Sequence, residues 1–236
     1  MPVSAPIPAT TMTDRGLLAL AHHEGLVPAP YLDAVDTWTF GIGHTAAAGD
    51  PDPETMPRGM PDDMEAGIAE AFRVFRADIA RYEADVRDAI KVPLAPHEFD
   101  ALVSFHYNTG GIARAALTRH LNAGNRVSAA NAFMGWRRPA SIIPRRKAEQ
   151  RLFRDGIYPG GTIPVWGVDR TGRVDFARPI RSLTARDALA LLRPEPSLSP
   201  PITTHAPEPP PAPATVAAPS WLTRLAAFLT TLIRRT

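Results

Sequence analysis

The chain has 236 residues, of which 44% are hydrophobic, so it is long and apolar enough to form a globular domain with accessory segments. It contains no cysteine, which excludes disulfides, thiolate catalysis and cysteine-ligated zinc. The formal net charge is only +2, but residues 50–100 are mainly acidic and residues 137–193 are rich in arginine. This asymmetry either steers a polyanion or reflects a solvated basic face.

The N-terminal region predicts a leader followed by one helix. Residues 1–13 are rich in Pro, Ala and Thr and lack the basic start and long apolar run of a signal peptide, so we expect a flexible leader. Thr13 or Asp14 is suited to cap a helix that continues to about Glu24, with leucines on its buried face. Gly25 favours a helix end at this point.

A β-hairpin is predicted directly after this helix. Pro28 and Pro30 prevent the helix from continuing. Aromatic and β-branched residues at 31–32 and 38–43 then flank a polar turn over 33–37, which is typical of two antiparallel strands.

A loop and a long helix follow the hairpin. Residues 45–60 are rich in Gly, Pro and Asp and predict a loop. Over about 62–90, apolar residues recur at steps of three and four, as one buried helical stripe requires. Glycine and proline punctuation then predicts several shorter helices, at about 96–108, 114–123, 126–135 and 144–155.

The C-terminal part changes character. Residues 162–180 hold two β-rich runs around a polar turn and predict a second hairpin. A short helix is expected over 184–192, capped by Thr184 with Asp187 three residues later. Proline dominates residues 194–219, which predicts an extended, semi-rigid linker. Residues 220–236 predict an amphipathic helix, too short to span a bilayer. We expect this helix to lie on a membrane surface; docking on the protein itself or on a partner is the alternative.

Three residues near the first hairpin suit the hydrolysis of a glycosidic bond. That reaction requires an acid that protonates the leaving oxygen and a second group that handles water or the developing cation. Glu24 at the predicted helix end and Asp33 in the turn can face each other across a cleft, and Thr39 can reach the same space with its hydroxyl. Such residues at this spacing are common, so the spacing alone is also compatible with structural roles.

The flanking residues make this pattern specific. Glu-Gly, an aromatic residue followed closely by Asp, and Thr-x-Gly-x-Gly-His occur here in the order and spacing of one known family. The region of about 14–158 resembles the phage-type, T4-like lysozymes and endolysins of glycoside hydrolase family 24. The residues that carry this resemblance are His23-Glu24-Gly25, Tyr31-Leu32-Asp33 and 38–45, and further downstream 99–110, 121–124, Trp136 and 145–149.

The resemblance implies an α+β, mainly helical, lysozyme-like fold over residues 14–193. A small N-terminal β-hairpin lobe would pack beside a helical lobe, and a long helix would join them. The implied reaction is hydrolysis of the β-1,4 bond between N-acetylmuramic acid and N-acetylglucosamine in bacterial peptidoglycan. Glu24 would be the general acid, expected to be partly withdrawn from water, while Asp33 and Thr39 would position the attacking water, with inversion. For Thr39, an ordinary cross-strand contact is the alternative.

Other residues are assigned to the cleft. Gly41, Gly43, Thr45, Tyr107 and Asn108 are predicted to contact the substrate. Close packing is the commoner reason for glycine in a strand. A core aromatic and a helix-ending Asn are equally good interpretations of Tyr107 and Asn108.

A second set is predicted to support the cleft. His44 and Asp78 are expected to form a structural pair. Arg145 or Arg146 is expected to pair with Glu24, and Glu149 with the other arginine. A nearby guanidinium favours a charged carboxylate whereas burial opposes it, and a solvated basic helix face is the alternative for these arginines.

Two other functions stay open. A lytic transglycosylase uses one Glu and no water, so it would not require Asp33 or Thr39. A non-catalytic wall- or membrane-disrupting module would use the basic surface and the C-terminal helix. We expect no cofactor, no metal and no nucleic-acid partner. The expected protein is a monomer that accumulates in the host cytoplasm and reaches periplasmic peptidoglycan by a holin-dependent route.

Overall fold

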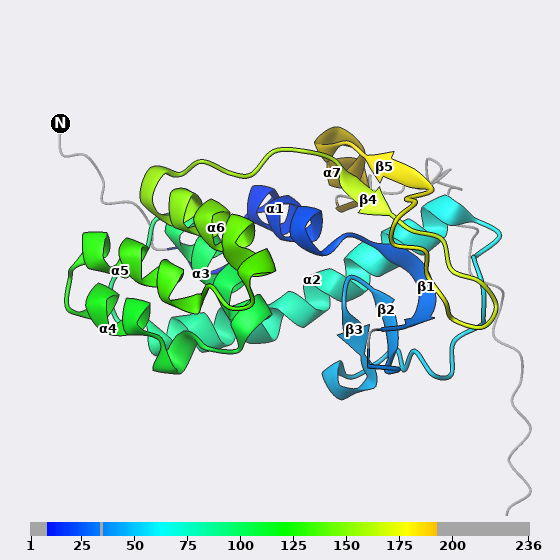
Figure 1. Ribbon diagram of the computed structural model, residues 1–236, viewed down its shortest axis with the longest axis horizontal. Helices are drawn as coiled ribbons and strands as arrows, with labels where there is room; N and C mark the ends of the chain where they lie inside the picture. The colour runs from blue at the N-terminus through cyan, green and yellow to red at the C-terminus, as the bar shows by residue number, and fades with distance from the viewer. Residues whose placement is uncertain (1–8, 34, 193–236) are drawn as a thin grey trace, which may run out of the picture. The chain divides into compact units, whose positions relative to one another are not determined.

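A long helix, α2 (Met64–Ala89), connects two lobes in the computed structural model, which describes residues 9–33 and 35–192 (Figure 1). The helix begins where the side chain of Asp63 accepts a hydrogen bond from the amide of Ala66. Its predicted apolar stripe is buried, and α2 packs on the sheet of one lobe and on α3 of the other. The expected α+β, mainly helical architecture is present.

The smaller lobe is a three-stranded antiparallel sheet preceded by a helix. Its elements are α1 (Asp14–Glu24), β1 (Val27–Leu32), β2 (Trp38–Gly41), β3 (His44–Thr45) and a short 3₁₀ turn at Ala46–Ala48. The strand order is β1-β2-β3. Strand β1 begins earlier than the predicted 31–32 and includes Pro28 and Pro30. This is compatible with a strand because β1 lies at the edge of its sheet, where a missing N–H breaks no ladder bond.

The two faces of this sheet have different surroundings. Phe40 is paired with His44 across β2 and β3, and both side chains are buried on the side that packs against α2. Thr39 is paired with Tyr31 on one side and with Thr45 on the other. Because cross-strand partners share a face and neighbours along a strand alternate, Tyr31, Thr39 and Thr45 lie on the face opposite α2.

The larger lobe is helical. It consists of α3 (Pro96–Thr109), α4 (Ala116–Asn122), α5 (Arg126–Ala132) and α6 (Ile143–Asp155), with 3₁₀ turns at Ile112–Arg114, Phe133–Trp136 and Ala140–Ile142. These elements match the predicted helices, except that the one predicted over 126–135 changes to a 3₁₀ turn after Ala132.

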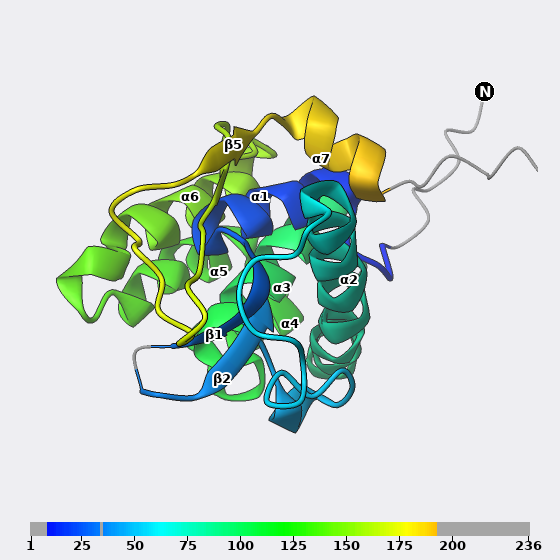
Figure 2. The ribbon, with the colours of Figure 1, turned by 90° about the vertical axis from the view of Figure 1, so that its right-hand side faces the viewer.

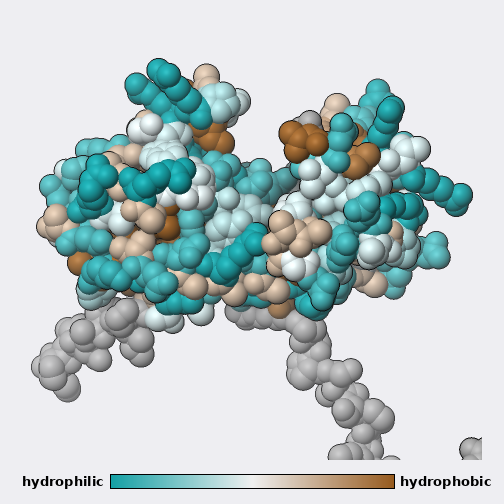
Figure 3. Space-filling model, turned by 90° about the horizontal axis from the view of Figure 1, so that it is seen from below, coloured by the Kyte–Doolittle hydropathy of each residue, from teal (hydrophilic) through white to brown (hydrophobic). Residues whose placement is uncertain are grey.

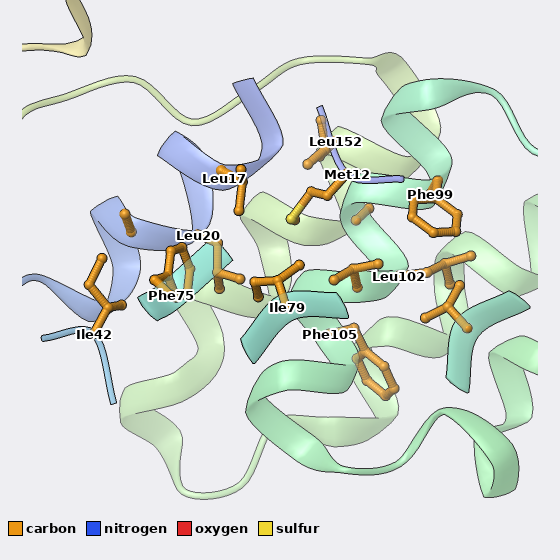
Figure 4. Packing of buried hydrophobic residues seen from close by; sticks show 14 of the residues in the cluster. Met12, Leu17, Leu20, Ile42, Phe75, Ile79, Phe99, Leu102, Phe105 and Leu152 are labelled. Carbon is orange, nitrogen blue, oxygen red and sulfur yellow. The ribbon is translucent and has the colours of Figure 1, made fainter. Parts of the chain in front are cut away.

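A continuous apolar core joins α1, α2 and α3. Figure 4 shows Leu17 and Leu20 of α1 beside Phe75 and Ile79 of α2, with Leu102 of α3 next along the row. All of these side chains are almost completely buried. Burial of such apolar surface is the main term that stabilises the fold.

Residues 9–13 correct the prediction of a flexible leader over 1–13. Met12 is only 3% exposed and belongs to the core, and its amide donates to Glu83 at 2.7 Å. The amide of Thr13 donates to the buried carboxylate of Asp100 at 2.9 Å. Composition alone did not reveal these partners, which lie more than seventy residues away. Residues 1–8 lie outside the described residues.

The C-terminal part contains β4 (Ile163–Val165), β5 (Arg181–Leu183) and α7 (Ala185–Leu192). The hairpin predicted over 162–180 is wrong in its main pairing, because β4 pairs with β5 and only one bridge, between Val168 and Val174, lies near the predicted turn. Strands β4 and β5 pair because apolar side chains of both strands are buried in the core. The predicted cap of α7, Thr184 with Asp187, is present.

Two further predictions fall beyond Leu192. The linker over 194–219 and the amphipathic helix over 220–236 lie outside the described residues. Among the helices that the structure describes, none combines the length and apolar character needed to cross a membrane.

Candidate active site

Glu24 is the last residue of α1 and lies where the two lobes meet. The helix ends because Gly25 has a φ of 71°, a conformation that favours glycine, while its amide still donates to Ala21. The side chain of Glu24 is 27% exposed, so its carboxylate is partly withdrawn from water, as expected.

Arg145 of α6 binds the Glu24 carboxylate. Its Nη1 lies 2.6 Å from Glu24 Oε1, and its Nε lies 3.1 Å from Glu149 Oε1. The guanidinium is buried, which lowers its pKa, but the charges of Glu24 and Glu149 outweigh this effect and raise the pKa of Arg145 above its usual value. Arg145 is therefore held in its charged form between two carboxylates.

Arg146 supports this pair from behind. It is fully buried, and its Nη2 donates to Glu149 Oε1 and to Asn108 Oδ1, both at 2.9 Å. Glu149 Oε1 also accepts the hydroxyl of Ser104. Burial raises the pKa of Glu149. The interpretation of α6 as a solvated basic face is wrong for both arginines. Arg145 pairs with Glu24 and Arg146 with Glu149, as expected, and Arg145 also bonds to Glu149.

His23 stands beside this network. Burial, and next the positive charge of Arg145, lowers the pKa of His23 from 6.5 to about 4. The ring is therefore neutral at neutral pH and adds no second cation next to Glu24.

Asp33 is fixed by the turn that it begins. Its Oδ1 accepts the amides of Val35 and Thr37, both at 2.9 Å, and its own amide donates to the carbonyl of Thr37. The carboxylate thus accepts the turn amides in place of backbone carbonyls, and these bonds hold it at the end of β1.

Tyr31 lies near both acidic residues and was not predicted as a site residue. Burial, followed by the negative charges of Asp33 and Glu24, raises the pKa of Tyr31 to about 12. Both carboxylates are therefore near enough to the phenol for their charges to act on it. The only signal in the sequence was an aromatic residue two positions before Asp33.

Thr39 is buried and makes a bond within its own hairpin. Its Oγ1 donates to the carbonyl of Thr37 at 3.1 Å, next to the turn that holds Asp33. Its two cross-strand partners, Tyr31 and Thr45, lie on the same face. This hydrogen bond runs to the adjoining turn rather than across the strands, and it keeps the Thr39 side chain close to Asp33.

The residues predicted to contact substrate also have packing roles. Gly41 has a positive φ, and a Cβ there would lie 3.1 Å from the Cβ of Ala71 in α2. At Gly43 a Cβ would lie 2.8 Å from the hydroxyl of Tyr107, which donates to the carbonyl of Ile42. Tyr107 thus ties α3 to the small lobe.

Surface shape is consistent with a cleft at this junction. Figure 3 shows the surface hollowed between the two lobes. On the helical side, a cavity of about 420 Å³ is lined by residues that include Asn108, Trp136 and Arg138. A larger cavity, about 600 Å³, lies between β1, residues 56–62 and residues 168–170. Neither cavity is lined by Glu24 or Asp33, so the carboxylates and their partners define the candidate site.

The predicted pair of His44 and Asp78 is present. His44 Nδ1 lies 2.9 Å from Asp78 Oδ2, and its Nε2 lies 2.8 Å from the carbonyl of Pro51. The pair is buried and joins β3, α2 and the following loop. The ring faces protein acceptors on both sides, which is the geometry of a structural residue.

Comparison with known proteins decides the family. The family model described as phage lysozyme matches residues 21–149, more than half of the chain. The chain belongs to the phage lysozyme family.

Individual relatives cover a similar region. The endolysin of Acyrthosiphon pisum secondary endosymbiont phage 1 is 33% identical over 153 residues, which cover 60% of this chain and 97% of that relative. The solved endolysin from Escherichia coli O157:H7 phage FAHEc1 is 30% identical with a TM-score of 0.55, covering 65% of this chain and 99% of the other. The SAR-endolysin of Escherichia phage Mu is 28% identical over 142 residues, which cover 57% of this chain and 76% of that relative.

Residues 157–192 follow the part that matches the phage lysozyme family, yet they contact the site directly. The carbonyl of Thr162 lies 2.9 Å from His22 Nδ1, before Glu24. Leu26, two residues after Glu24, donates its amide to the carbonyl of Pro164. Leu32, immediately before Asp33, donates its amide to the carbonyl of Gly172. The two views in Figures 1 and 2 show the β4–β5 loop running alongside β1. This segment therefore holds the stretch from Glu24 to Asp33 at both ends.

The shifted pKa of His23 predicts a pH effect on stability. As pH falls from 6.5 to about 4, the unfolded chain takes up this proton before the folded chain does, so the folded state loses up to about 3 kcal/mol. We expect His23→Gln to flatten the fall in the free energy of urea unfolding across this window. His120→Gln, at an exposed histidine of α4, serves as the control. Equal acid sensitivity of His23→Gln and the unaltered protein would contradict the assignment.

Proposed function

We propose that this chain is an endolysin muramidase of the T4-like type, glycoside hydrolase family 24, which hydrolyses the β-1,4 bond between N-acetylmuramic acid and N-acetylglucosamine in bacterial peptidoglycan for host lysis. The observation that carries the proposal is the carboxylate of Glu24 at the end of α1, bound at 2.6 Å by the buried Arg145, with Asp33 fixed by two turn amides at the end of β1. Membership of the phage lysozyme family and the endolysin relatives support the same activity.

Glu24 acts as the general acid in this proposal. Its proton passes to the glycosidic oxygen, and the bond between that oxygen and the anomeric carbon breaks. Glu24 becomes negatively charged as the proton leaves, and Arg145, 2.6 Å away, stabilises this charge. The same bond restricts the rotamers of the Glu24 side chain, so the acid is held in place before the substrate arrives.

Asp33 and Thr39 position the attacking water in this proposal. The water oxygen bonds to the anomeric carbon from the face opposite the leaving group, and its proton passes to Asp33, which gives inversion. Asp33 Oδ1 is fixed by two turn amides. The Thr39 hydroxyl already donates to Thr37 and offers its oxygen lone pairs to the water. Gly43, Thr45, Tyr107 and Asn108 line the sugar path in this proposal.

The proposal includes the route by which the protein reaches the cell wall. The protein acts as a monomer, accumulates in the host cytoplasm and passes through a holin-dependent pore to the periplasmic peptidoglycan. The relative from phage Mu is called a SAR-endolysin, which makes secretion the competing route.

The amphipathic residues 220–236 bind the membrane surface in this proposal. Deletion of 194–236 should leave the cleavage rate on isolated sacculi unchanged but reduce cosedimentation with anionic liposomes. Equal liposome binding by both forms would exclude the membrane role.

The catalytic assignment predicts that Glu24→Gln abolishes hydrolysis. An amide cannot donate the required proton, so we expect the rate of release of reducing ends from purified peptidoglycan to fall by about a hundredfold or more. Mass spectrometry of the products gives the measurement, and Glu54→Gln, at an exposed loop carboxylate, should match the unaltered protein.

The same experiment separates the alternatives. Anhydro-muramyl ends in the products of the unaltered protein would indicate a lytic transglycosylase and contradict hydrolysis. Lysis that persists in a folded Glu24→Gln variant would indicate a membrane-disrupting module.

A further inference from the structure

The segment that follows the family match adds aromatic side chains beside the candidate site. Trp166 and Phe176 both belong to the connection between β4 and β5. Their ring centroids lie 5.2 Å apart with the planes at 72°, and the ring of Phe176 lies 6.3 Å from Tyr31 at 76°. These edge-to-face contacts join two rings of the accessory segment to one ring of the lysozyme core.

Phe176 is exposed although it belongs to this cluster. It is 54% exposed, whereas the phenylalanines of the main core are almost completely buried. Its ring is therefore supported from behind by Trp166 and Tyr31 and keeps an apolar surface in contact with water. A ring that is held by aromatic neighbours and still exposed to water is available to stack on the flat face of a ligand.

The sheet directs this surface toward the catalytic residues. Tyr31 is the cross-strand partner of Thr39, and Thr39 is the partner of Thr45, so the three side chains share one face. Phe176 contacts Tyr31, the member of this row that lies on the edge strand β1. A chain molecule that binds at Tyr31 therefore also reaches Phe176.

The backbone around the cluster is closely fitted. A Cβ at Gly25, the residue after Glu24, would lie 1.8 Å from the Trp166 ring, so Trp166 packs directly on the end of α1. The amide of Leu26 donates to the carbonyl of Pro164 in β4, and the amide of Trp166 donates to the carbonyl of Leu26, the residue before β1. The aromatic cluster is thus held in a fixed position relative to Glu24.

We propose that Phe176, supported by Tyr31 and Trp166, forms an additional saccharide subsite that binds an N-acetylhexosamine unit of the glycan strand beyond the cleavage point. This rests on the proposed function. The C–H face of a pyranose ring is apolar and flat enough to stack on an exposed aromatic ring, while its hydroxyls remain available to the Tyr31 hydroxyl. A tyrosine phenol is protonated at neutral pH and can donate, and burial raises the pKa of Tyr31 further, to about 12.

The test compares Phe176→Ala with Val127→Ala, which shortens a still more exposed apolar side chain on α5. On soluble glycan strands, Phe176→Ala should raise KM about three- to tenfold, as expected for loss of one aromatic contact, and change kcat by less than about twofold. Phe176→Trp should restore KM, and Val127→Ala should leave it unchanged. An unchanged KM for folded Phe176→Ala would overturn the subsite. If that variant also bound anionic vesicles less well, Phe176 would be a membrane contact instead.

A binding experiment keeps this test independent of the proposed reaction. In the full-length Glu24→Gln protein, hexa-N-acetylchitohexaose should shift the NMR resonance of the Trp166 indole N–H, and Phe176→Ala should weaken that titration by about the same factor. Saturable binding without any release of reducing ends by the unaltered protein would remove the proposed function but keep the subsite. A Trp166 resonance that does not respond to the hexamer would overturn the subsite.

Discussion

The bond between Arg145 and Glu24 is the interaction on which the site depends. It connects the end of α1 to α6, two elements separated by more than a hundred residues. A buried guanidinium is costly unless carboxylates and hydrogen-bond acceptors surround it, and Glu149 supplies the second carboxylate. Glu149 is in turn held by Ser104 of α3 and by Arg146. Three helices are therefore fixed around one acid.

The position of Asp33 depends on a different constraint. Strand β1 is an edge strand that carries Glu24 just before its start and Asp33 just after its end. The segment over 157–192 bonds to Leu26, just before β1, and to Leu32 at its end, so it restrains the backbone between Glu24 and Asp33. The lysozyme core supplies the acidic residues, and the accessory segment restricts their movement and extends the adjoining surface with Phe176.

Much of this arrangement could be predicted from the sequence because the signals are local. The apolar period over α2, the cap at Thr13 and the glycine after Glu24 each act through residues within one or two helical turns. Contacts between distant residues left no such signal. The β4–β5 ladder, the docking of Met12 on Glu83 and the cluster of Tyr31 with Phe176 depend on which surfaces meet in three dimensions. The motif predicted that an arginine would face Glu24, but not that Arg145 would bind both carboxylates.

Replacement of Arg145 by lysine measures the importance of its bond to Glu24 most directly. Lysine keeps the charge but loses the planar fork that reaches Glu24 and Glu149 together. We expect folded Arg145→Lys to lose at least about tenfold in kcat on soluble glycan strands, with an altered pH profile and KM within about twofold of the unaltered protein. Arg137→Lys, at an exposed arginine, should change neither value. A folded Arg145→Lys protein with unchanged kcat and pH profile would contradict the role assigned to this bond.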